Sequence, residues 1–149
     1  MALVQRNVLI EASPLQTMEL LSDAIRWPDW YPGMTQIDID APFPDKGGKV
    51  TFKVSSAGVS MKITETVLEF EPAKLQLLEM EGMLSGRARW ELTPEGSGTR
   101  LTTTFDYALP GGVLGRIADA LIVKRMNSKS LEGGLANLKE LAERPQAVT

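Results

Sequence analysis

The chain has few residue types that could carry out chemistry. Among its 149 residues there is no histidine and no cysteine. Their absence excludes serine–histidine catalysis, imidazole acid/base chemistry, thiolate metal sites and cysteine nucleophiles. Any proton transfer would depend on aspartate, glutamate, tyrosine, lysine or arginine. The glutamates between residues 65 and 81 are spread over two predicted strands without ligand spacing, so we expect no metal site and no cofactor.

Three residues have the strand parity to point inward and take part in proton transfer. Tyr107 lies near the end of the last predicted strand, Arg6 lies on the apolar face of the first, and Glu65 lies on the fourth. Glu65 points inward if a bulge follows it, because the apolar parity changes along that strand. Desolvation would then raise its pKa unless it is paired, and Arg6 is a candidate partner. The structural alternative is that Arg6 extends to solvent at a sheet end and Glu65 is exposed.

Aromatic residues provide the second set of candidates. The segment 26–34, RWPDWYPGM, contains two of the three tryptophans and two prolines. These rings either plug one end of a core or border a ligand cavity. As ligand-binding residues we predict Trp30, Tyr31, Trp90, Phe105 and Tyr107, together with Ile117 and Leu121 from the C-terminal helix. The alternative is that all of them fill a solid core.

Most of the chain consists of segments with the alternation of β-strands, joined by short loops rich in glycine and proline. Consecutive strands with such loops predict an antiparallel meander that is apolar on one face. The predicted strands are residues 3–12, 35–40, 49–55, 59–70, 74–81, 85–93 and 99–109.

A short helix is expected between the first two strands. Ser13 is a suitable N-cap, and Pro14 suits the first helical position. The helix should end near Arg26, because Pro28 disfavours helical geometry in the preceding residue. Its apolar side is predicted to contain Leu15, Met18, Leu21 and Ile25.

A long helix is predicted at the C-terminal end, over residues 113–143, between the sequence LPGG and Pro145. It contains no proline, and apolar residues recur along it at helical spacing, so that one side is mostly apolar. We expect the sheet to wrap around this helix. Residues 114–121 are interpreted as a cavity wall and residues 131–142 as the core anchor.

The middle of this helix is polar. Lys124, Arg125 and Lys129 could form a basic patch for a partner protein, although a solvated helix face explains them equally well. Gly133 and Gly134 follow, and each lowers helix stability by about 1 kcal/mol relative to alanine. We expect a bend here, or a close approach of the sheet.

The order of strand, short helical segment, six strands and long helix resembles the helix-grip, or START-like, superfamily. WPDWYPGM after the first helix, TPEGSGTRLTTTF at the last hairpin, and LPGG before a helix ending in LANLKELAE contribute to this resemblance. The group is also described as polyketide cyclase/dehydrase and lipid transport. The resemblance implies an α+β fold, with a curved seven-stranded antiparallel sheet around the C-terminal helix, short helices after the first strand, and an apolar cavity between the sheet and the C-terminal helix. Members include binding proteins, lipid and quinone carriers, aromatic cyclases and chaperone activators, so the fold leaves the function open.

Bulk composition limits the partners. The net charge is −3 and the pI is about 5.1, so nucleic acid is not an expected partner. No segment resembles a signal peptide or approaches the length of a membrane span, which favours a cytoplasmic protein without stable membrane insertion. The oligomeric state stays open.

From these observations we predict one START-like domain over residues 1–149 that binds a hydrophobic small molecule: a lipid, polyketide, isoprenoid or quinone-like compound. One alternative is an enzyme of the cyclase/dehydratase type that acts on a polyketide-like substrate. A further alternative is a protein-interaction module of the chaperone-activator type.

Overall fold

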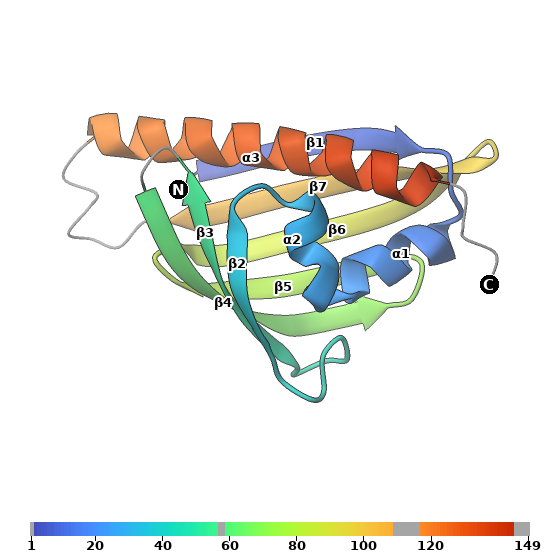
Figure 1. Ribbon diagram of the computed structural model, residues 1–149, viewed down its shortest axis with the longest axis horizontal. Coiled ribbons are helices and arrows are strands. Elements are labelled where there is room, and N and C mark those ends of the chain that lie inside the picture. Colours follow the sequence, from blue (N-terminus) through green and yellow to red (C-terminus); the bar gives the residue numbers. More distant parts are fainter. Residues whose placement is uncertain (1, 57–58, 109–116, 145–149) are drawn as a thin grey trace.

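The computed structural model describes residues 2–56, 59–108 and 117–144. In Figure 1 the sheet curls strongly from β1 to β2, α3 runs along β1, and α1 and α2 lie in front of the sheet. The elements are β1 (Ala2–Ile10), α1 (Pro14–Ser22), a 3-10 turn (Ala24–Arg26), α2 (Trp27–Trp30), β2 (Met34–Ile39), β3 (Lys49–Ser56), β4 (Val59–Glu71), β5 (Leu75–Gly82), β6 (Ser85–Glu95), β7 (Gly98–Ala108) and α3 (Ile117–Glu143).

The predicted antiparallel meander is confirmed. The seven strands of the described residues form one sheet in the order β1-β7-β6-β5-β4-β3-β2, and every neighbouring pair is antiparallel. The pairing of β4 with β5 shifts between Val67 and Glu69, so the bulge lies after Glu65. Together with α3, this is the α+β helix-grip architecture. The first residues of the predicted long helix, 113–116, lie outside the described residues.

The segment after β1 begins as predicted. The Ser13 hydroxyl accepts a hydrogen bond from the Gln16 amide at 3.1 Å, and the Gln16 side chain accepts one from the Ser13 amide at 3.2 Å. This reciprocal pair satisfies backbone donors that the first helical turn leaves free. Ser13 and Pro14 therefore fix where α1 starts.

The prediction of one continuous short helix ending near Arg26 is wrong. The α1 helix ends at Ser22, and Asp23 leaves helical geometry with φ −96° and ψ 81°. Trp27 is helical and opens α2, with Pro28 in its first turn, where a backbone N–H has no helical partner to lose. The proline thus begins a second helix.

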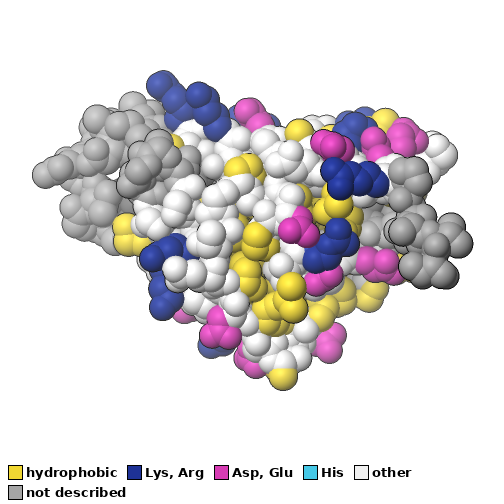
Figure 2. Space-filling view, viewed as in Figure 1, with side chains coloured by type: hydrophobic (Ala, Val, Ile, Leu, Met, Phe, Trp, Pro, Cys, Tyr) yellow, Lys and Arg dark blue, Asp and Glu magenta, His cyan; other side chains and the backbone are white. Residues whose placement is uncertain are grey.

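Two residues assigned to the buried side of this helix are exposed. Leu15 is 55% exposed and Ile25 is 74% exposed. Ile25 lies beyond the change of direction at Asp23, so the spacing from Leu21 no longer places it on the inner face. Figure 2 shows hydrophobic side chains gathered on the face that carries α1 and α2.

The second half of α3 is the core anchor that its sequence predicts. Leu131, Leu135 and Leu138 are buried in the main hydrophobic core. Their spacing places them along one side of the helix, facing the sheet. Within the described residues, neither the short helices nor α3 combines the length and apolar composition that crossing a membrane requires.

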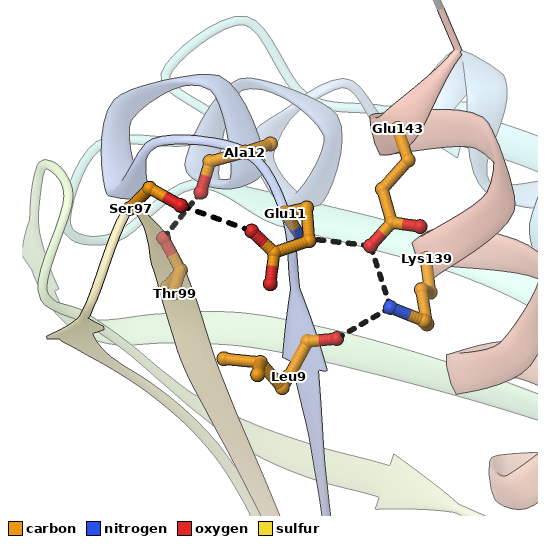
Figure 3. Close-up of polar contacts among 7 residues, drawn as sticks. All are labelled: Leu9, Glu11, Ala12, Ser97, Thr99, Lys139 and Glu143. Atoms are coloured by element: carbon orange, nitrogen blue, oxygen red, sulfur yellow. Dashed lines mark hydrogen bonds and ion pairs between the residues drawn. The ribbon is translucent and has the colours of Figure 1, made fainter.

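Polar contacts attach the same half of α3 to the end of β1 (Figure 3). The Lys139 ammonium donates to the Leu9 carbonyl oxygen at 2.7 Å, and the Glu11 amide donates to the Glu143 carboxylate at 2.7 Å. Hydrogen bonds from the Lys139 ammonium and from the Glu11 amide to the Glu143 carboxylate, together with the positive charge of Lys139, lower the pKa of Glu143. The helix is therefore held in register with β1 as well as by apolar packing.

Close approach of β6 and β7 depends on Gly86, which pairs with Tyr107. Gly86 has φ +148°, and a Cβ at this position would lie 2.0 Å from the Asp106 carbonyl oxygen and 2.7 Å from the Tyr107 Cα. Only glycine fits both this backbone geometry and this space. Gly86 thus sets the position of the strand that carries Tyr107.

We expect Gly86→Ala to lower the free energy of unfolding by at least about 2 kcal/mol, through backbone strain and the contact with β7. Gly96→Ala is the matched control, because Gly96 also has positive φ but has open space around its Cβ position. It should cost only about 1 kcal/mol. Urea denaturation of both variants checks this, and equal losses would contradict the role assigned to close strand approach.

Candidate ligand-binding cavity

An apolar cavity lies inside the curve of the sheet and is closed by residues of α1, α2 and α3. Its volume, counted as the space open to the centre of a water molecule, is about 60 Å³. This is several times the roughly 10–15 Å³ that one water needs by the same measure. The lining residues are Leu21, Trp27, Trp30, Tyr31, Met34, Phe52, Val54, Met61, Ile63, Glu65, Gln76, Leu78, Met80, Leu84, Trp90, Phe105, Tyr107 and Asn127.

The five aromatic residues predicted to bind a ligand all line this cavity. Four of them form a continuous chain of edge-to-face contacts. Trp30 packs against Tyr31 and against Trp90, and Trp90 packs against Phe105, each pair with ring centroids 5.9 Å apart. Such pairs contribute about 0.5–1.5 kcal/mol each beyond the area they bury. The fifth, Tyr107, lies on the strand that also carries Phe105. Their contact with a ligand stays a prediction.

The two predicted helix residues, Ile117 and Leu121, belong to α3, but their side chains lie outside the described part of the structure. The α3 residue that is seen to line the cavity is Asn127, which the sequence analysis did not select. It precedes Leu131 by four positions and Leu135 by eight, so it lies on the same buried side of the helix. Its spacing from these two leucines was the available signal in the sequence.

Trp30 and Tyr31 reach the cavity because α3 lets their segment approach closely. A Cβ on Gly134 would lie 3.2 Å from the Tyr31 ring, and one on Gly133 would lie 3.3 Å from Pro32. The Asn137 amide also donates a hydrogen bond to the Trp30 carbonyl oxygen at 3.0 Å. Gly133 and Gly134 therefore allow Tyr31 and Pro32 to approach α3 closely. The alternative that the sheet approaches α3 at these glycines is wrong.

Glu65 brings a carboxyl group into these apolar surroundings. Its side chain points inward from β4 and the residue is only 7% exposed. Loss of hydration raises the pKa of Glu65 from 4.5 to about 8, because burial penalises the charged form. At neutral pH the group is therefore mostly a neutral acid, which can both donate and accept a hydrogen bond.

The proposed pairing of Arg6 with Glu65 is wrong. Arg6 forms an ion pair with Glu132 of α3, with Nε and Oε1 3.0 Å apart, and it also donates to the Gln5 carbonyl oxygen. Both partners of this ion pair are substantially exposed. Arg6 does start from the apolar face of β1, but its long side chain extends to solvent at the edge of the sheet. This is the structural alternative given above.

Two tyrosines are the other titratable groups among the described lining residues. Burial raises the pKa of Tyr31 well above its ordinary value, and the nearby Glu65 and Tyr107 raise it further. Burial also raises the pKa of Tyr107, while the neighbouring Asn127 side chain acts in the opposite direction. Both phenols are thus neutral hydrogen-bonding groups near Glu65.

Three buried polar atoms of cavity-lining residues lack a hydrogen bond of good geometry among the described residues, although the Asn127 side chain lies close enough to the Tyr107 hydroxyl to lower its pKa. They are Trp30 Nε1, the Tyr107 hydroxyl and Asn127 Nδ2. An unsatisfied buried polar group costs about 1–3 kcal/mol. The cavity wall therefore combines apolar side chains with a few polar ones, which is the usual composition of small-molecule sites.

The other candidate surfaces are less defined. Lys124, Arg125 and Lys129 are exposed on α3, and their binding to a partner protein stays a prediction. Within the described residues, no group of three or more aspartate or glutamate side chains is placed to hold a metal ion.

Comparison with known families gives one match. The family model described as polyketide cyclase/dehydrase and lipid transport matches residues 1–143. No curated protein sequence is similar enough to count as a relative.

Solved structures share the fold at low sequence identity. The protein TTHA0849 from Thermus thermophilus is 20% identical, with a TM-score of 0.81 over 95% of this chain and 97% of that one. The Zhui aromatase/cyclase from Streptomyces sp. R1128 is 18% identical, with a TM-score of 0.76 over 96% and 94% of the two chains. The Aha1 dimer from Colwellia psychrerythraea is 16% identical, with a TM-score of 0.69 over 99% and 100%.

The buried carboxyl makes stability depend on pH. Between pH 4.5 and about 8 the folded protein keeps the Glu65 proton and the unfolded chain releases it. The contribution of Glu65 to stability therefore falls across this window, by up to about 1.4 kcal/mol per pH unit. Glu65→Gln should remove this loss and be the more stable protein at pH 8, by on the order of 3 kcal/mol.

Urea denaturation at pH 5, 6.5 and 8 measures the effect. Glu69→Gln is the matched control, because Glu69 lies on the same strand and is exposed. If the two variants follow the same pH dependence, Glu65 does not carry a raised pKa.

Proposed function

The chain belongs to the polyketide cyclase/dehydrase and lipid transport family, and on this premise we propose that it binds a hydrophobic small molecule in the cavity between the sheet and α3. The observation that carries the proposal is the cavity wall, in which apolar and aromatic side chains surround a few unpartnered polar atoms. A wall of this kind favours a ligand that combines an apolar body with a polar atom, because the body is removed from water and the polar atom can bond the unpartnered groups.

The ligand class that suits this wall is broad. Lipids, polyketides, isoprenoids and quinone-like compounds all combine an apolar body with oxygen atoms. The edge-to-face chain of rings from Tyr31 to Phe105 presents ring faces and edges to the cavity. Flexible side chains in the rest of the wall come from Met34, Met61 and Met80. Methionine adapts its shape to a ligand at low cost, which supports binding of compounds that differ in outline.

A second candidate function is catalysis of a cyclase/dehydratase reaction. Glu65 supports it, because a carboxyl with a pKa of about 8 holds its proton at neutral pH and is suited to general acid catalysis. It could protonate the departing hydroxyl group of a polyketide-like substrate, which leaves as water. The resulting carboxylate could then take a proton from the adjacent carbon, which restores the acid. Tyr107, on the same cavity wall, could orient the substrate oxygen.

Filling the cavity tests the binding function. Val54 lines the cavity from β3, and Val54→Phe would place extra carbon atoms inside it. We expect at least a tenfold loss of affinity, about 1.4 kcal/mol, for the uncharged probe N-phenyl-1-naphthylamine, measured by fluorescence titration. Thr35→Phe, at an exposed position of β2, should bind like the wild type. Undiminished binding by a folded Val54→Phe protein would show that the ligand binds elsewhere.

Turnover tests the enzyme alternative. The purified protein is incubated with a synthetic poly-β-keto thioester, and the appearance of an aromatic product is followed by absorbance and mass spectrometry. Catalysis through the cavity predicts a loss of at least a hundredfold in kcat for Glu65→Gln, in line with the loss of one general acid, and no change for Glu69→Gln. Binding without turnover would support the carrier function and contradict the enzymatic function.

A further inference from the structure

We propose that the cavity selects uncharged molecules with a carbonyl or hydroxyl oxygen on an apolar body and excludes apolar carboxylates of similar size, a selectivity that rests on the proposed binding function and narrows its ligand class. Neutral ketones, phenols and quinones would bind, and fatty-acid-like anions would not. The groups that decide this are Glu65, Trp30, Tyr107 and Asn127 on the cavity wall.

The unpartnered atoms favour an acceptor. Trp30 Nε1 and Asn127 Nδ2 are donors, and the Tyr107 hydroxyl can donate as well. A carbonyl oxygen accepts up to two hydrogen bonds, and a hydroxyl oxygen can accept and donate. Either group would recover bonds that the buried wall lacks without bringing a charge into the cavity.

The carboxyl group of Glu65 disfavours an anion. A ligand carboxylate in this small space would lie near Glu65 and next to two phenols, and none of the described lining residues is lysine or arginine. Burying a charge without a partner costs several kcal/mol. Even when Glu65 is neutral, the donors of the wall would give the anion hydrogen bonds but no ion pair in return for its lost hydration. An uncharged ligand avoids this cost.

Ionisation of Glu65 should control affinity for such a ligand. The titratable groups that the described wall presents to the cavity are Glu65 from β4, Tyr31 after α2 and Tyr107 from β7. The pKa of Glu65 is about 8 and both tyrosine pKa values are raised, so Glu65 ionises first. The neutral acid can donate to a ligand oxygen and the carboxylate cannot, so affinity should fall as pH rises through 8.

Three probes with the same ring system isolate the recognition of oxygen and charge: 2-acetylnaphthalene, 2-naphthoate and 2-ethylnaphthalene. Equilibrium dialysis against the full chain at pH 7 should give affinity for the ketone at least about tenfold above that for the carboxylate, a difference of about 1.4 kcal/mol. The hydrocarbon should bind more weakly than the ketone, because it leaves the polar atoms unpaired.

The pH dependence of binding is measured with 2-acetylnaphthalene alone. Its Kd for the wild type should rise about tenfold between pH 7 and pH 9, as the fraction of neutral Glu65 falls. Glu65→Gln, which keeps an N–H donor and cannot ionise, should bind the ketone at pH 9 as it does at pH 7. The exposed Glu69→Gln control should keep the pH dependence of the wild type.

Failure of the proposed selectivity and failure of the proposed binding function give different results. Equal or tighter binding of 2-naphthoate, equal binding of the hydrocarbon, or a ketone affinity in the wild type that does not change with pH would each overturn the selectivity and leave the binding function standing. If none of the three probes binds, the proposed binding function fails with it.

Discussion

The close packing of the segment after α2 against α3 is the constraint on which the cavity depends. Gly133 and Gly134 leave the space that Pro32 and the Tyr31 ring occupy, and Asn137 holds the Trp30 carbonyl oxygen. A Cβ at either glycine would be tighter than ordinary van der Waals contact, so Tyr31 and Pro32 would have to shift by a few tenths of an ångström. The contact of Trp30 with Trp90 depends on the position of the same segment. A helical element with two glycines, unfavourable locally, is thus required by tertiary packing.

The second constraint is the carboxyl group that this packing encloses. Glu65 lowers the stability of the folded protein at neutral pH, because the unfolded chain can ionise it freely. Leucine or methionine on this row of β4 would avoid that cost. A buried acid beside unpartnered donors is the kind of arrangement found where binding or chemistry occurs. Packing of the core therefore does not explain the position of Glu65, which suits the binding or catalytic role proposed above.

Sequence patterns predicted the features that depend on local geometry. Alternation placed Trp90, Phe105 and Tyr107 on the inner face. The change of parity in β4 predicted a bulge after Glu65, which leaves Glu65 on the inner face. Contacts between distant elements were not predictable in this way. The partner of Arg6 depends on how α3 lies along β1. The periodicity of a strand or a helix does not predict how two such elements align with each other. Asn127, by contrast, did carry a local signal, because it precedes the buried Leu131 by four positions on the same helix.

Glu65 could serve a carrier and an enzyme from the same position. A neutral carboxyl that donates to a ligand oxygen stabilises the bound ligand, and the same group becomes a catalyst if that oxygen gains negative charge or departs as the reaction proceeds. The wall is identical in both cases, so the fold that the chain shares with an aromatase/cyclase does not choose between them. The choice depends on the ligand, because only a substrate with a leaving hydroxyl and an acidic carbon within reach of Glu65 would turn a binding contact into a proton transfer.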